Sequence, residues 1–229
     1  TLDIRQQCTG FVYGLATADA MIKSGQVKRI LFVGAEVHSA GLDISTRGRD
    51  VAVLFGDGAG AVCLEGIETS ENVGVLATAL HSQGKFANQL YVEAPAFRNW
   101  PSVTAAHLEE GRQFPKMEGQ TVFKNATRRM PEVAHEVLRK AGLQVSDVDL
   151  LIPHQANLRI NQMVQRQLAL PDNKVFNNIM RYGNTTAASI PLALDEAIEL
   201  GKVPPKATML FIAFGAGFTW GGLAYRSPR

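Results

Sequence analysis

The sequence predicts an α/β fold built from two duplicated halves, with helices covering mixed sheets. Helical and strand-like patterns alternate along the chain, which is typical of α/β proteins. A helix–glycine–strand unit occurs twice, at residues 19–35 and at residues 195–214. In both copies Asp, Ile and Gly align, and an apolar run follows the glycine. Such a repeat indicates two halves of similar design.

The first half is predicted to span residues 1–119. After Cys8, apolar residues recur at helical spacing until Gly25, which is placed to end the helix. The apolar run 29–35 then predicts a buried strand. Further strands are predicted at 51–64, around a glycine turn at 56–60, and at 73–81. From 82 to 119 the periodicity fails and prolines recur, which predicts a long loop region.

The second half is predicted to span residues 120–229. Its first helix, 120–141, contains Pro131, and proline is expected to kink or break a helix. Amphipathic patterns predict two more helices, and apolar runs predict three strands. The helices are predicted at 157–168 and 185–200, and the strands at 148–152, 207–214 and 218–225.

Composition excludes several classes of protein. The chain has 229 residues, of which 46% are hydrophobic and 19% charged, and its net charge is +2. This charge is too small for a nucleic-acid-binding face. The longest uncharged run, 207–225, holds four glycines, which favours two strands over a membrane span. Two distant cysteines, without zinc spacing, fit the reducing cytoplasm.

The chain begins with Thr1 rather than Met, which predicts a fragment, a processed chain or one half of a split protein.

Cys8 and Cys63 carry different expectations. Cys8 lies at the start of a predicted helix, where the helix dipole lowers a thiol pKa and favours a nucleophile. A packed, inert cysteine is the competing interpretation, and position alone does not separate the two. Cys63 lies inside an apolar strand run, so a buried structural role is expected for it.

Two polar residues lie where α/β proteins place their ligands. His154 follows a predicted strand, at the edge where the ligand crevice usually forms, although a capping role would also explain it. Asn184 precedes a predicted helix, and Asn is a preferred N-cap residue. The turn at 215–217 could direct a backbone N–H at an oxyanion. The glycine turn at 56–60 matches no phosphate-binding fingerprint.

Taken together, these segments resemble the β-ketoacyl-acyl-carrier-protein synthase III family of thiolase-like condensing enzymes. The resemblance extends over nearly the whole chain, and its His motif is highly specific. The matching segments are residues 8–11, 56–61, 117–124, 154–160, 183–191 and 214–221. The fold this implies is a layered α-β-α-β-α arrangement whose first half is incomplete. The family has further sequence before the nucleophile, so this chain is not expected to act alone.

The family's catalytic roles fall on three residues. Cys8 would take an acyl group from an acyl-CoA as a thioester. His154 and Asn184 would donate hydrogen bonds to the thioester carbonyl of malonyl-acyl carrier protein as CO2 leaves. The backbone N–H groups of Cys8 and Ala216 would form a second oxyanion hole. Ala216 stands where some members have glycine, but only its N–H group is required.

The resemblance also assigns substrate contacts and partners. The residues expected to bind substrate or coenzyme A are Arg47, Gly119, Phe123, Asn157 and Phe214. Lys124 and Arg159 would attract the acidic carrier protein. No metal or redox cofactor is implied, because coenzyme A enters as a substrate thioester. A cytoplasmic homodimer is implied, completed by the N-terminal segment and without nucleic acid or membrane partners.

Other activities are compatible with the same residues. A related acyltransferase would use the same acyl-Cys8 without decarboxylation. Thiolase fits less well because it needs a second active-site cysteine, and the plant-type polyketide synthases match less well outside the three catalytic residues. A different class is a non-catalytic module that binds acyl chains or carrier protein, for which Cys8 would be unreactive.

Overall fold

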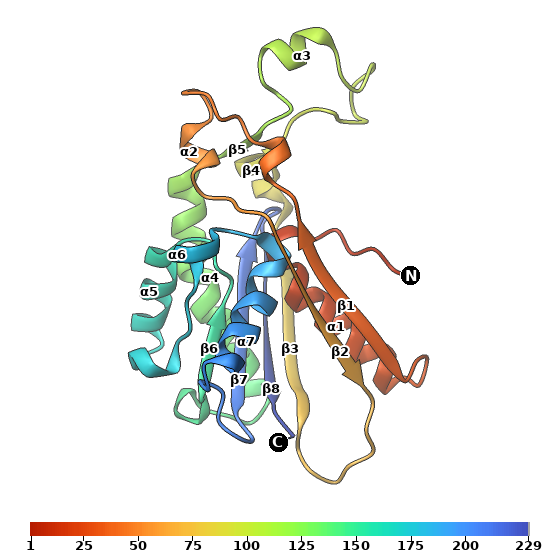
Figure 1. The fold of residues 1–229 in the computed structure, drawn as a ribbon, viewed down its shortest axis with the longest axis vertical. Coiled ribbons are helices and arrows are strands. Elements are labelled where there is room, and N and C mark those ends of the chain that lie inside the picture. Colours follow the sequence, from red (N-terminus) through yellow and green to blue (C-terminus); the bar gives the residue numbers. More distant parts are fainter. Residues whose placement is uncertain (229) are drawn as a thin grey trace.

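Two sheets and the helices around them form the body of the computed structural model, which describes residues 1–228 (Figure 1). The helices are α1 (Gly10–Lys23), α2 (Arg49–Ala52), α3 (Ala105–Glu109), α4 (Gly119–Lys140), α5 (Leu158–Gln167), α6 (Ile179–Tyr182) and α7 (Ser189–Glu199). The strands are β1 (Arg29–Glu36), β2 (Gly58–Glu65), β3 (Gly74–Ser82), β4 (Leu90–Val92), β5 (Pro115–Met117), β6 (Leu150–Pro153), β7 (Thr208–Gly215) and β8 (Thr219–Arg226). None of the helices within residues 1–228 has the length and apolar character needed to cross a membrane.

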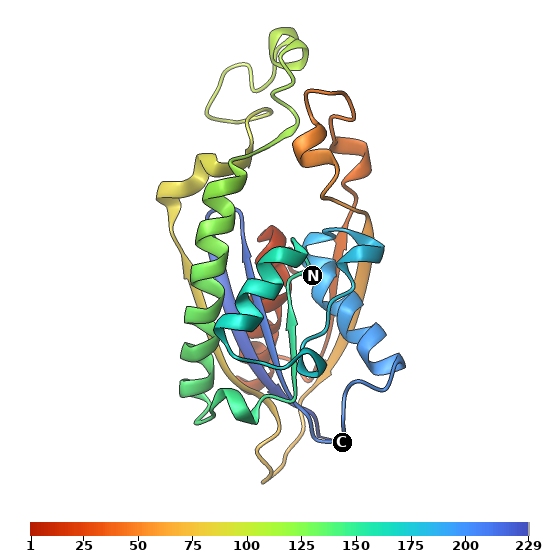
Figure 2. The same ribbon diagram turned by 90° about the vertical axis from the view of Figure 1, so that its left-hand side faces the viewer.

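The elements form layers, which Figure 2 shows edge-on. A sheet in the order β3-β8-β7-β6 has α4 and α5 packed on one face. Helices α1 and α7 pack on its other face and separate it from the two-stranded sheet β1-β2. Because β6 and β7 are parallel while β7 and β8 are antiparallel, the larger sheet is mixed. The predicted α/β fold, in which helices cover mixed sheets, is confirmed.

The internal repeat is visible in three dimensions. Helix α1 leads through Gly25 into β1, and α7 leads through Gly201 into β7. Both glycines have a positive φ, 76° and 65°, a conformation that glycine adopts without strain. In each copy the strand then pairs with an antiparallel neighbour. Strand β3 pairs with β8, so residues 74–82 belong to the sheet of the second half, although the sequence grouped them with the first.

Residues 29–35 form a strand as predicted, but the prediction that this strand is buried is wrong. Alternate residues of β1 face solvent, and Leu31 and Val33 are 70% and 52% exposed. Their cross-strand partners on β2 include Cys63, which is also exposed. Helices α1 and α7 cover the opposite face only. Cys63 therefore lies on a strand as expected but is not a buried structural cysteine.

The glycine segment 56–60 does not interrupt a strand. Residues 49–52 form α2, and β2 begins at Gly58. A Cβ atom on Gly60 would lie 2.8 Å from the side chain of Pro191 on α7. Glycine is thus needed here because the strand and the helix approach closely. Asp57 holds the end of β1 by accepting hydrogen bonds from the backbone N–H groups of His38 and Ser39.

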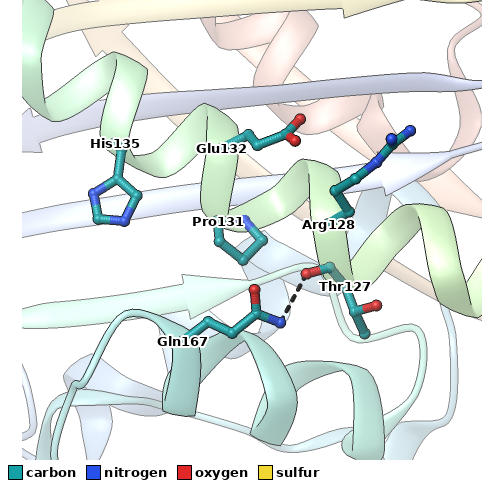
Figure 3. Close-up of a pocket in the computed structure, with 6 residues that line it drawn as sticks. All are labelled: Thr127, Arg128, Pro131, Glu132, His135 and Gln167. Atoms are coloured by element: carbon teal, nitrogen blue, oxygen red, sulfur yellow. Dashed lines mark hydrogen bonds between the residues drawn. The ribbon is translucent and has the colours of Figure 1, made fainter.

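Pro131 lies inside α4 and does not break it, so of the two expected effects, a kink or a break, the break is absent. Proline lacks the N–H that would bond the carbonyl of Thr127, four residues earlier. Gln167 on α5 donates its Nε2 hydrogen to that carbonyl over 3.0 Å, as Figure 3 shows. The two residues lie in a groove of about 400 Å³ between α4 and α5, which Arg128, Glu132 and His135 also line. A side chain from a neighbouring helix therefore replaces the missing bond.

Residues 82–119 hold short elements in place of a structureless loop. These residues form an arm that lies above the sheets in Figure 1. Strands β4 and β5 pair at its base, and α3 lies near its outer end. Phe97 and Trp100 are almost fully exposed on this arm. The second tryptophan, Trp220, is 8% exposed, stacks on the His81 ring and contacts the Arg129 guanidinium.

Candidate active site

A cavity of about 220 Å³ opens beside the carboxyl ends of β6 and β7. In an α/β sheet, ligands bind at this edge, where loops carry the functional side chains. Cys8, His154 and Asn184 all line the cavity. They come from three separate parts of the chain: the 3-10 turn Gln7–Thr9, the loop after β6 and the loop after α6. The structure thus brings together the three residues that the sequence singled out.

Cys8 is buried, with 6% of its surface exposed. Burial raises the pKa of its thiol to about 12, because the thiolate would lose its hydration. The backbone N–H groups of Ala216 and Cys8 act in the opposite direction, and the Glu36 carboxylate raises the pKa further. The expectation of a lowered thiol pKa is therefore wrong for the resting chain. Burial in the cavity outweighs the favourable position before α1.

The turn between β7 and β8 lies directly against Cys8. A Cβ atom on Gly215 would lie 2.4 Å from the Cβ of Cys8 and 3.1 Å from its sulfur. Only glycine allows this approach. The next residue, Ala216, directs its N–H at the sulfur. Two backbone N–H groups, those of Cys8 and Ala216, thus approach the Cys8 sulfur.

His154 is 1% exposed and its ring is fixed from one side. Its Nδ1 lies 2.6 Å from Oγ of Ser189, the first residue of α7. Its Nε2 is buried without a hydrogen-bond partner in the described residues, and the side chain lines the cavity. Burial lowers the pKa of His154 to about 3, so the imidazole is neutral at physiological pH. A neutral ring with one free nitrogen is available to bind a ligand atom.

Asn184 is held by its backbone and by its own carbonyl group. Its N–H donates to Leu54, and its main-chain oxygen accepts from Gly56. The side-chain Oδ1 accepts a hydrogen bond from the Thr186 N–H over 2.9 Å. This bond orients the amide so that the Nδ2 donor remains for the cavity. Asn184 is not the N-cap of α7, since Ala188 occupies that position.

The remaining predicted residues divide into two groups. Gly119, Phe123, Asn157 and Phe214 line the cavity with Cys8. Asn157 also caps α5, because its Oδ1 accepts from the Arg159 N–H. The structure places Arg47, Lys124 and Arg159 outside the cavity lining. Lys124 and Arg159 are exposed on α4 and α5, and neither forms an ion pair within residues 1–228.

Arg47 contacts residues of the arm and of its own loop. Its Nε donates to Oδ2 of Asp43 over 2.6 Å, and its Nη1 donates to the carbonyl oxygen of Glu109 over 3.3 Å. The guanidinium also lies 5.6 Å from the centre of the Phe114 ring. Hydrogen bonds from Ser45 and Arg47 lower the pKa of Asp43. Arg47 is therefore held in one orientation by the arm and by its own loop.

Two features of the site were missed from the sequence. Ser189 contacts His154, and Asp50, Leu54 and Phe55 contribute part of the cavity wall. Ser189 lies within the same short segment as Asn184, which was a signal that could have identified it. The wall residues carried no local signal, because the bridge between Phe55 and Asn184 joins distant parts of the chain.

Comparison with known proteins decides the family. Residues 2–84 match the model for 3-oxoacyl-[acyl-carrier-protein] synthase III, and residues 138–227 match the model for its C-terminal region. The chain belongs to the 3-oxoacyl-acyl-carrier-protein synthase III family. It is 43% identical over 227 residues to a β-ketoacyl-[acyl-carrier-protein] synthase III of Cereibacter sphaeroides. That match covers 98% of this chain and 66% of the relative.

Solved structures of the synthase III family share the fold. The enzyme from Pseudomonas aeruginosa is 39% identical with a TM-score of 0.88, and the match covers 100% of this chain and 67% of that one. The enzyme from Aquifex aeolicus is 42% identical with a TM-score of 0.86, covering 98% of this chain and 66% of that one. A priming β-ketosynthase of the R1128 polyketide pathway is 31% identical with a TM-score of 0.85, covering 99% and 65%.

Proposed function

We propose that this chain carries the catalytic centre of a decarboxylating Claisen condensation. The substrates are an acyl-CoA starter and malonyl-acyl carrier protein, and the product is a 3-oxoacyl-acyl carrier protein that initiates fatty acid synthesis. The observation that carries the proposal is that Cys8, His154 and Asn184 line the same cavity. Each presents to it a group that the reaction needs: a sulfur nucleophile and two hydrogen-bond donors.

In the first step the Cys8 sulfur attacks the carbonyl carbon of the acyl-CoA. The new carbon–sulfur bond forms as the bond to coenzyme A breaks, and the thiol proton leaves with coenzyme A. The N–H groups of Cys8 and Ala216, which already point to the sulfur, would stabilise the oxyanion of the tetrahedral intermediate. This assistance matters because a thiol with a raised pKa is a weak nucleophile.

In the second step the malonyl thioester enters the same cavity. Its carbonyl oxygen would accept hydrogen bonds from Nε2 of His154, which has no partner in the described chain, and from Nδ2 of Asn184, whose amide is oriented by the Thr186 N–H. The bond to the carboxylate then breaks, CO2 leaves, and the electron pair remains as an enolate stabilised by these donors. The enolate carbon attacks the acyl-Cys8 carbonyl, Cys8 leaves as a thiolate, and it takes up a proton.

The surroundings fit this use of the cavity. Phe123, Phe214 and Gly119 form an apolar wall suited to the pantetheine and acyl chains. Exposed Lys124 and Arg159 flank it on α4 and α5 and would attract an acidic carrier protein. The fixed guanidinium of Arg47 would contact the coenzyme A nucleotide. The chemistry requires no metal or redox group, since decarboxylation is driven by the stabilised enolate.

We further propose that the enzyme acts in the cytoplasm as a homodimer. Both cysteines, Cys8 and Cys63, are free, which fits a reducing compartment. The exposed apolar face of β1-β2 is suited to contact with further protein. Light scattering of the full-length protein would measure its mass in solution, and a monomeric mass would contradict the dimer.

Intact-mass spectrometry tests the reaction directly. The full-length protein is incubated with acetyl-CoA and with longer acyl-CoAs, alongside Cys8→Ala and the matched control Cys63→Ala. The acyl mass is expected on the wild type and on Cys63→Ala, and it should be absent from Cys8→Ala. Adding malonyl-acyl carrier protein should then release CO2 and form the 3-oxoacyl product. Acyl transfer without CO2 would indicate the related acyltransferase, and no acyl mass would indicate a binding module.

A further inference from the structure

Ser189 is the partner of His154 on the side away from the cavity. It is the first residue of α7, is 2% exposed, and places its Oγ 2.6 Å from Nδ1 of the imidazole. The same oxygen accepts a hydrogen bond from the backbone N–H of Gln155 over 3.3 Å. One hydroxyl group thus contacts both the histidine and the loop that carries it.

The hydroxyl hydrogen of Ser189 has one acceptor available in the described residues. A serine hydroxyl provides one hydrogen and two acceptor positions, and the Gln155 N–H already occupies one of these positions. Within residues 1–228, the one potential acceptor in hydrogen-bond contact with Oγ is Nδ1 of His154. If Nδ1 carried a proton, two hydrogens would face each other or the buried serine hydrogen would have no acceptor, which is costly. The arrangement that gives the Ser189 hydroxyl, the Gln155 N–H and Nδ1 of His154 each a partner has Ser189 donating to Nδ1.

The loop around His154 is fixed firmly enough to hold this geometry. The Gln155 side chain donates to the carbonyl of Pro153 and accepts from the N–H groups of Asn178 and Ile179. It is 1% exposed, so water does not compete for these bonds. The His154 N–H also donates to the carbonyl of Ile212 on β7. The imidazole therefore cannot easily turn to present its other nitrogen.

We propose that Ser189 is a positioning residue that fixes His154 in the tautomer protonated at Nε2. This proposal rests on the proposed function, in which Nε2–H donates to the carbonyl oxygen of the malonyl thioester. A neutral imidazole protonated at Nδ1 would present a lone pair to that oxygen and repel it. Since the pKa of His154 is lowered to about 3, protonation of both nitrogens does not supply the donor at neutral pH. Ser189 thus decides whether the histidine is a donor or an acceptor.

The tautomer itself is measured first, on the full-length wild-type protein. Histidine labelled with nitrogen-15 is incorporated, and His154 is assigned by comparison with His154→Asn. The expected spectrum shows a protonated Nε2 and an unprotonated Nδ1 between pH 6 and 8. A protonated Nδ1 would overturn the proposal without any need for a Ser189 variant.

The two half-reactions then separate positioning from folding. In Ser189→Ala, acylation of Cys8 by acetyl-CoA should stay within about twofold of the wild type. Decarboxylative condensation with malonyl-acyl carrier protein should fall about tenfold to a hundredfold, the range found for partners that orient a metal-ligating histidine. The kcat should fall more than KM rises, and Ser189→Thr, which keeps the hydroxyl, should recover most of the rate. Thr208→Ala, which removes a buried hydroxyl at the opposite end of β7, is the control and should retain both half-reactions.

The outcomes keep this proposal distinct from the proposed function. If wild-type protein is not acylated at all, the proposed function fails while the tautomer measurement still stands. Condensation by Ser189→Ala at the wild-type rate would overturn the role of Ser189. An equal loss of both half-reactions would do the same, because it would indicate a general disturbance of the site.

Discussion

Strand β7 is buried along its whole length, whereas β1, which follows the equivalent helix and glycine, exposes every second residue over most of its length. The two strands have similar sequences, and both contact the central helices through one face. The difference lies on the other face, which α4 and α5 cover for β7 and which remains open for β1. Burial is thus decided by the neighbouring layer and not by the strand's own sequence.

The largest expected effect comes from a matched pair of leucines in the two copies. Leu210 on β7 is 1% exposed beneath α4, and Leu31 at the equivalent position of β1 is 70% exposed. Leu210→Ala should lower the free energy of unfolding by about 2–5 kcal/mol, because it removes buried apolar volume. Leu31→Ala should change it by less than about 0.5 kcal/mol. Urea unfolding measures both, and equal losses would show that the open face of β1 is covered in solution.

A second pair compares a glycine of the site with one of the first half. Gly215→Ala would force a Cβ to within 2.4 Å of the Cys8 Cβ, so the sulfur should shift. Acylation of Cys8 should fall about a hundredfold, the usual cost of displacing a reacting atom by roughly 1 Å. Gly41→Ala meets no atom within 4 Å and should leave acylation unchanged. Full activity of Gly215→Ala would refute the close contact.

The loss of folding stability at acid pH should come mainly from the second half of the chain. Burial lowers the pKa of His154 from 6.5 to about 3, so in this window the unfolded chain binds a proton that the folded chain does not. Stability should therefore fall as the pH drops from about 6.5 towards 3. Unfolding midpoints measured across this range should depend less on pH in His154→Gln. His38→Gln, just after β1, should reduce the pH dependence of the unfolding midpoint less than His154→Gln does. A larger reduction in His38→Gln would contradict the assignment of the acid sensitivity to His154.

The smallest effect tests the covering helix itself. Gln167→Ala removes the donor that satisfies the Thr127 carbonyl beside Pro131. The free energy of unfolding should fall by about 1 kcal/mol, the usual value of one hydrogen bond. Gln26→Ala, at an exposed position after α1, is a suitable control and should have no measurable effect. Chemical denaturation measures the difference, and an unchanged midpoint would mean that water replaces the side chain.

The sequence alone predicted the features that depend on local pattern. Helices α1, α4, α5 and α7 and the pair β7-β8 follow from periodicity, and the meeting of Cys8, His154 and Asn184 follows from the resemblance to the synthase III family. The errors came from partners distant in the sequence. Pro131 is tolerated because of Gln167, and the Cys8 thiol is more basic than expected because other segments close over it. Ser189 is significant only because α7 begins beside the loop after β6.

The placement of the two tryptophans provides an optical readout of the molecule. Trp100 is 97% exposed on the arm, while Trp220 is 8% exposed and contacts a histidine ring and a guanidinium. Fluorescence from Trp100 should have a long emission wavelength and should be quenched readily by dissolved acrylamide. Emission from the second should be shifted to the blue and shielded from the quencher. A Trp220→Phe variant leaves a fluorophore that reports on the arm alone, so partner contact with the arm could be followed separately from changes beside the sheet.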